Sequence, residues 1–86
     1  MNQRVRIYSR GQSGNPDELG AIVLKDGHLV PEPNILALTG LLHETLFVRY
    51  GGNNLEIDPE KEPELFLKLL KRALRGSYLW AGEVET

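Results

Sequence analysis

The clearest pattern of hydrophobic and polar positions runs from Pro63 to Gly76. At the 100° step of an α-helix, its apolar side chains fall on one arc of about 200°. They are Leu65, Phe66, Leu67, Leu69, Leu70, Ala73 and Leu74. The rest of the circle carries four cations, Lys68, Lys71, Arg72 and Arg75. We therefore expect a helix that begins at Pro63, ends before Gly76 and buries its leucine-rich side.

The N-terminal part of the chain predicts strands. Residues 4–8 alternate strictly between aliphatic and polar side chains, which is typical of a half-exposed strand. Residues 10–17 have no periodicity and contain glycine, asparagine and proline, so we expect a loop there. Residues 19–25 resume the strand pattern.

Asp26-Gly27 predicts a tight hairpin turn, because both residue types adopt positive φ at low cost. A two-residue turn at this point makes apolar residues face apolar residues across the hairpin. The expected pairs are Lys25 with His28, Leu24 with Leu29 and Val23 with Val30. Pro31 and Pro33 lack an N–H group, so we expect them to end the ladder.

The middle of the chain predicts a short helix followed by a second hairpin. Apolar residues recur at helical spacing over residues 35–42, with Asn34 as the expected N-cap. Residues 45–50 and 55–58 then form two strands around Gly51-Gly52-Asn53-Asn54. A symmetric loop of four residues pairs Tyr50 with Leu55, Val48 with Ile57 and Arg49 with Glu56.

The C-terminal residues leave two possibilities open. Residues 77–81 alternate, with Tyr78 and Trp80 on one side, and form either a final strand or a tail docked on the sheet. Residues 82–86 are expected to be a flexible tail. Together the elements predict an α+β fold, in which a mostly antiparallel sheet of two β-hairpins has two helices packed on one face.

Composition narrows the class of protein. The 86 residues are enough for one small domain, residues 1–86, with a modest core and without a deep catalytic cleft. The chain has no cysteine, which excludes disulfides and thiolate metal sites and suits the cytoplasm. The N-terminus lacks the apolar run of a signal peptide, and no stretch reaches the ~20 apolar residues that span a bilayer.

We find no pattern of residues that indicates catalysis, a cofactor or a metal. His28 and His43 have no partner at metal-ligand spacing, and we interpret His43 as a helix C-terminal residue. The acidic residues Asp58, Glu60, Glu62 and Glu64 are interrupted by prolines and are typical of a helix start rather than a calcium loop. The glycines and serines match no phosphate loop and no nucleophile elbow, so we do not expect an enzyme.

Two features remain as candidate binding sites. The only tryptophan, Trp80, lies two residues after Tyr78 and close to Arg72 and Arg75 in sequence. Aromatic side chains dominate both cores and interface centres, so Trp80 is either a plug of the small core or part of a docking surface. Our leading hypothesis is a non-catalytic interaction module or accessory subunit that self-associates through Tyr78, Trp80, Arg75 and Arg72.

The cations support an alternative hypothesis, nucleic-acid binding. Arg4 and Arg6 together with the helix row Lys68, Lys71, Arg72 and Arg75 could neutralise phosphates. Cations on the outer face and in the last turns of a helix are also the ordinary solvated arrangement. No aromatic residue lies on that side of the helix in the sequence pattern, although single-strand binders usually combine cations with stacking rings.

Overall fold

The computed structural model describes residues 2–10 and 16–86 and confirms the α+β class. Its elements are β1 (Gln3–Arg10), β2 (Pro16–Lys25), β3 (His28–Glu32), α1 (Leu36–Leu42), β4 (Leu46–Tyr50), β5 (Asn53–Ile57), α2 (Pro63–Ala73) and β6 (Leu79–Glu85). All strand pairs are antiparallel, as expected. Most of the loop predicted at residues 10–17 lies outside the described residues, although Arg10 ends β1 and Pro16 begins β2.

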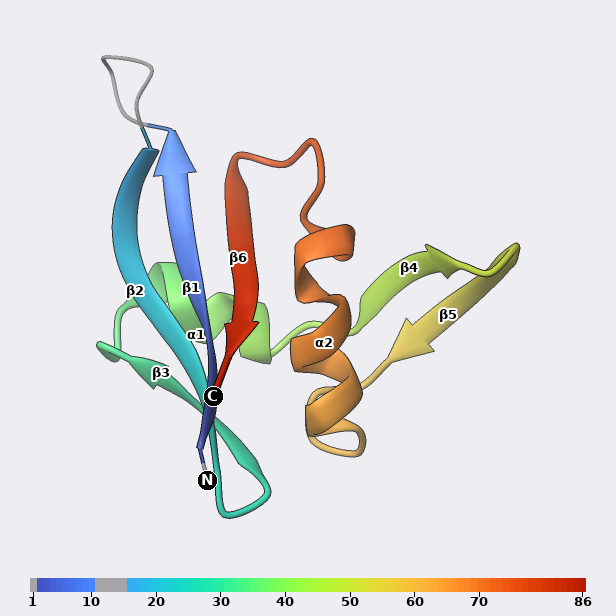
Figure 1. Ribbon diagram of the computed structural model, residues 1–86, viewed down its shortest axis with the longest axis horizontal. Helices are drawn as coiled ribbons and strands as arrows, with labels where there is room; N and C mark the ends of the chain where they lie inside the picture. Colours follow the sequence, from blue (N-terminus) through green and yellow to red (C-terminus); the bar gives the residue numbers. More distant parts are fainter. Residues whose placement is uncertain (1, 11–15) are drawn as a thin grey trace.

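The strands form two sheets rather than one. The larger sheet has the order β3-β2-β1-β6, and β4 and β5 form a separate two-stranded sheet. Figure 1 shows this second hairpin extending away from the larger sheet on the far side of α2. The second hairpin therefore reaches the body of the protein through α2, to which β4 is packed.

The alternation predicted for the first strand is confirmed by the burial of β1. Val5, Ile7 and Ser9 are buried, whereas Arg4 and Arg6 are exposed. Ile22 of β2 pairs with Val5 and is also fully buried, so this inner face of the sheet forms one wall of the core. We call the opposite side, which carries Arg4 and Arg6, the outer face.

The first hairpin has the predicted register. Lys25 pairs with His28, and the turn residues Asp26 and Gly27 have φ of 50° and 80°, as a two-residue turn of this type requires. The prediction that proline ends the ladder was wrong for Pro31, which pairs with Ile22 inside β3. Since β3 is an edge strand, a residue without an N–H group is tolerated where its nitrogen points away from β2.

The second hairpin has a tighter turn than predicted. Tyr50 pairs with Asn53 rather than with Leu55, because Gly51 and Gly52 alone make the turn, with φ of 61° and 82°. The ladder is therefore displaced by two positions, which keeps every side chain on its predicted face but changes its partner. Arg49 lies opposite Asn54, and Glu56 lies opposite Phe47, so the predicted Arg49–Glu56 pair is wrong.

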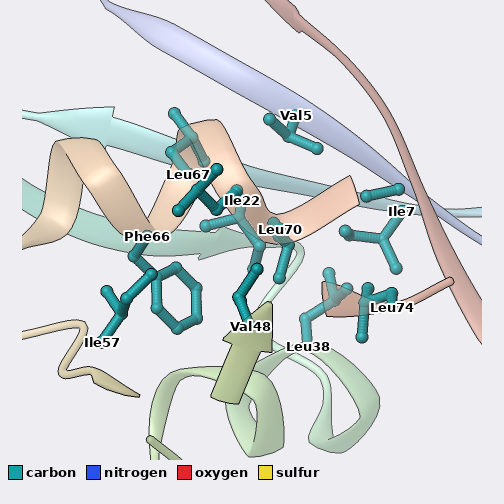
Figure 2. Packing of buried hydrophobic residues seen from close by; sticks show 12 residues of the cluster. Val5, Ile7, Ile22, Leu38, Val48, Ile57, Phe66, Leu67, Leu70 and Leu74 are labelled. Carbon is teal, nitrogen blue, oxygen red and sulfur yellow. The ribbon is translucent and has the colours of Figure 1, made fainter. Parts of the chain in front are cut away.

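Helix α2 supplies the largest part of the core. It begins at Pro63 as predicted, and Gly76 follows it with a φ of 84°. Its buried side chains pack against Val5, Ile7 and Ile22 of the sheet, Leu38 of α1 and Val48 and Ile57 of the second hairpin (Figure 2). The cations Lys68, Lys71, Arg72 and Arg75 are all exposed, which confirms the predicted division of this helix into two sides.

Helix α1 is shorter than its sequence pattern and has a different N-cap. Ile35, not Asn34, occupies the N-cap position, and no side chain caps the helix. Leu38 is its only buried residue and belongs to the same hydrophobic cluster as α2. The shared cluster, which also contains Val5 and Ile7, fits the expected packing of both helices on the inner face of the sheet.

Residues 77–81, left open between a strand and a docked tail, belong to a strand from Leu79 onward. β6 pairs with β1 and continues to Glu85, so residues 82–85 are part of the sheet and not of a flexible tail. The pairing of β1 with β6 has a register shift: Val5 pairs with Val84 and Ile7 with Ala81, so Gly82 and Glu83 of β6 lie opposite the single residue Arg6. This irregularity interrupts the period of two on which the prediction depended.

Candidate interaction surfaces

The outer face of the larger sheet is covered by long charged side chains. Ala21 and Val23 lie on this face, opposite Arg6 and Arg4 of β1, and are nevertheless buried. The ion pair between Lys25 Nζ and Glu32 Oε2, 2.6 Å long, joins residues on either side of the Val23–Val30 pair. Because the aliphatic stems of such side chains cover apolar surface, this half of the face is shielded without a second layer.

Arg6 extends the same arrangement toward β6. Its guanidinium lies 2.8 Å from Glu85 Oε2 and 3.3 Å from Glu18 Oε1. The carboxylates of Glu85 and Glu18 raise the pKa of Arg6 above its usual value. Likewise, the hydrogen bond and charge of Lys25 lower the pKa of Glu32. A phosphate would therefore have to displace Glu18 and Glu85 to bind Arg6.

Tyr8 and Trp80 lie together at the other end of the outer face, and Tyr78 directly precedes β6 in the chain; we call these three residues the aromatic patch. Tyr8 pairs with Trp80 across β1 and β6, and their ring centroids are 5.2 Å apart at a 37° angle. Trp80 is 41% exposed and Tyr78, just before β6, is 71% exposed. Trp80 therefore does not plug the core, which was one of the two roles open for it.

A second site lies between α2 and the second hairpin, and we call it the basic hollow. It has a volume of about 310 Å³ and is lined by Tyr50, Lys68, Leu69, Lys71, Arg72 and Arg75. The Arg72 guanidinium lies 5.1 Å from the centroid of the Tyr50 ring, a cation–π contact. The helix itself carries no aromatic residue on its cationic side, as its sequence pattern indicated, and β4 brings Tyr50 to that side from elsewhere in the chain.

The structure divides the cations of the nucleic-acid hypothesis into two groups. Arg4 and Arg6 lie on the outer face of the sheet, whereas the helix cations lie on the exposed side of α2, which packs against the inner face. Lys71 is ion-paired with Glu83 of β6. Within residues 2–10 and 16–86, Lys68, Arg72 and Arg75 make no ion pair with a carboxylate.

The two histidines line a single groove. This groove, about 690 Å³ in volume, lies between the β2–β3 hairpin, α1 and the segment around Pro59, and His28 and His43 both reach it. Its walls are largely apolar, with Leu29, Val30, Pro31 and Leu42 among them. In the part of the chain that the structure describes, no three histidine, aspartate or glutamate side chains are grouped as a metal site.

The acidic residues before α2 have a structural role that the geometry shows directly. Asp58 Oδ1 accepts a hydrogen bond of 2.9 Å from the backbone N–H of Glu60, and the Asp58 carbonyl accepts one from Glu62. The side chain thus makes an Asx turn that leads the chain into the helix. Glu64 lies in the first helical turn, where its charge complements the helix dipole.

In the described residues, neither helix has the length and apolar character needed to cross a membrane.

Comparison with other proteins adds no functional information to this geometry. A scan against protein-family models, a search of curated proteins and a search of solved structures each find no match for the chain.

Proposed function

We propose that the protein is a non-catalytic interaction module that self-associates through the aromatic patch. The observation that supports this proposal is the exposure of Tyr78 and Trp80, 71% and 41%, with Trp80 against Tyr8 on a sheet face that no helix of the described residues covers. Aromatic side chains bury a large area at a small entropic cost, and for this reason tryptophan and tyrosine are enriched among the residues that dominate interface energies.

A second copy of the chain is the partner that the surrounding charges favour. The patch borders Arg6 and Arg10 of β1 as well as Glu18 and Glu85 of the neighbouring strands. Two cations and two carboxylates give this region no net charge, so two copies related by a two-fold axis do not repel each other. A two-fold interface requires a surface of this self-complementary kind.

Arg72 and Arg75 are not part of this proposed interface, although the sequence placed them near Trp80. They line the basic hollow together with Tyr50. We propose the cytoplasm as the location of the protein, since a chain without cysteine needs no oxidising compartment.

Light scattering over micromolar to millimolar concentrations tests the proposal. We expect the wild-type protein to form a dimer and Trp80→Ala to raise its dissociation constant by about 30-fold or more, the effect of losing a residue worth at least ~2 kcal/mol at an interface. Tyr78 lies outside β6, so Tyr78→Ala should weaken the dimer without lowering the free energy of unfolding.

Phe47→Ala is the matched control, because Phe47 is an aromatic residue of β4 that is 74% exposed outside the patch. It should leave the dimer unchanged. A wild-type protein that stays monomeric at every concentration would rule out self-association. A dimer that all three variants leave intact would place the interface elsewhere.

A further inference from the structure

We propose that the basic hollow binds the backbone of a single-stranded nucleic acid, with Tyr50 as a stacking platform for a base. This inference is independent of the self-association proposed above, because it uses other residues. It also differs from a site that combines all the cations of the chain, since Arg4 and Arg6 lie on the outer face of the sheet.

The charge of the hollow is uncompensated by its own walls. Four of its six lining residues are cations and none is acidic. Lys71 is paired with Glu83, and among residues 2–10 and 16–86 no carboxylate pairs with Lys68, Arg72 or Arg75, which leaves these three for an external anion. Clustered like charges raise the local potential and attract a ligand of opposite sign even when the net charge of the protein, here −2, is negative.

Tyr50 makes a single strand the preferred anion. It is 44% exposed, and Arg72 covers one part of its ring at 5.1 Å. Single-strand binders combine a cationic groove with rings and guanidinium planes on which bases stack. An acidic peptide would use the cations but not the aromatic ring, and the bases of a duplex are already stacked on each other.

The cations of the hollow set the size of the contact. From Lys68 to Ala73, the last residue of α2, the helix rises five steps of 1.5 Å, or about 7.5 Å, and Arg75 lies two residues beyond the helix end. Each of Lys68, Arg72 and Arg75 can neutralise one phosphate, so the contact covers about three phosphates of the strand. Three neutralised phosphates give a slope of about −2 for the logarithm of affinity against that of salt concentration, so a tenfold rise in salt weakens binding about 100-fold.

Fluorescence anisotropy with a labelled oligouridylate of about ten nucleotides, within the site sizes known for such grooves, measures this binding. We expect Arg75→Gln to reduce the magnitude of the salt slope by about 0.7, the contribution of one phosphate contact. Glu83→Gln frees Lys71, and we expect it to tighten binding and to increase the magnitude of the slope by about 0.7. A gain of affinity cannot result from a variant that fails to fold.

Tyr50→Leu tests the stacking platform, with Tyr50→Phe as the conservative variant. Loss of one stacked base weakens binding by about 5- to 150-fold, and phenylalanine should retain most of the affinity. Arg4→Gln is the matched charge control outside the hollow and should leave affinity within about twofold, the screened effect of a distant charge.

Three results would overturn the proposal. One is the absence of binding at low salt. Another is an affinity for oligoglutamate that equals the affinity for the oligouridylate, with neither affinity changed by Tyr50→Leu. The hollow would then be a site for acidic peptides. The third is an Arg4→Gln variant that loses as much affinity as Arg75→Gln, since binding would then be diffuse rather than localised in the hollow.

Discussion

Replacement of Gly20 by alanine should destabilise the fold strongly. Gly20 has a φ of 151°, a region that is essentially restricted to glycine. A Cβ atom at this position would overlap the backbone carbonyl oxygen of Glu32 and lie 2.7 Å from Pro33 Cδ and 2.9 Å from Leu38 Cδ1. The absence of a side chain at Gly20 therefore lets the end of β3 and Leu38 of α1 pack closely against β2.

The magnitude follows from two separate costs. The unfavourable backbone conformation costs about 1–3 kcal/mol for a residue with a side chain. Overpacking against neighbours that include backbone costs about 1–3 kcal/mol more. We expect Gly20→Ala to lower the free energy of unfolding by about 3 kcal/mol or more, which lowers Tm by about 12–24 °C in a domain of this size.

Thermal and urea unfolding followed by far-UV circular dichroism measures the effect. Gly82→Ala is the matched control in the same sheet, because the nearest atom to its added Cβ is Tyr8 Cε2 at 3.6 Å, an ordinary contact. The control should keep wild-type stability or gain up to about 1 kcal/mol, as alanine does over glycine in a strand. A Gly20→Ala protein within about 0.5 kcal/mol of wild type would refute the reasoning, because that is the range of an unconstrained surface substitution.

Further predictions concern the core, the outer face and α1. Phe66→Ala removes a fully buried ring between the sheet and the second hairpin, and chemical denaturation should show a loss of about 3–5 kcal/mol. The pKa of Glu32 is lowered by Lys25, so its ionised form contributes stability above its ordinary pKa of 4.5, and this is lost as pH falls through the lowered value. Thermal melts of Glu32→Gln should therefore show a smaller loss of stability on acidification than wild type, and an identical pH profile would contradict the pairing. Leu36 is 87% exposed, so Leu36→Lys should change the unfolding free energy by at most about 0.5 kcal/mol.

The local patterns predicted the fold well where one turn fixed the pairing. Asp26-Gly27 has only one favourable two-residue turn, and its apolar pairs agree with that turn, so the register of the first hairpin is predictable. Gly51-Gly52-Asn53-Asn54 allows turns of two or four residues, and both keep the apolar side chains on one face. The hydrophobic pattern alone does not choose between them, although Gly-Gly is itself a favoured pair for the two-residue turn that the structure has.

The candidate sites were less predictable because each depends on strands that are distant in sequence. Tyr8 contacts Trp80 only because β1 and β6 pair. Tyr50 reaches Arg72 only because the second hairpin forms its own sheet and docks on α2. The pattern of Pro63–Gly76 identified the exposed cations correctly, but Tyr50, the aromatic neighbour of Arg72, lies outside that segment.

The ion pairs decide which cations can act on a partner. Arg6 and Lys25 are neutralised by Glu85, Glu18 and Glu32, and their stems cover Ala21 and Val23, so recruiting them to a ligand would break contacts that shield apolar surface. Lys68, Arg72 and Arg75 make no ion pair within the described part of the chain. An external anion can therefore engage the helix cations without a cost in folding, whereas the same anion on the outer face would compete with the fold itself. We therefore expect electrostatic binding in the basic hollow rather than on the outer face of the sheet.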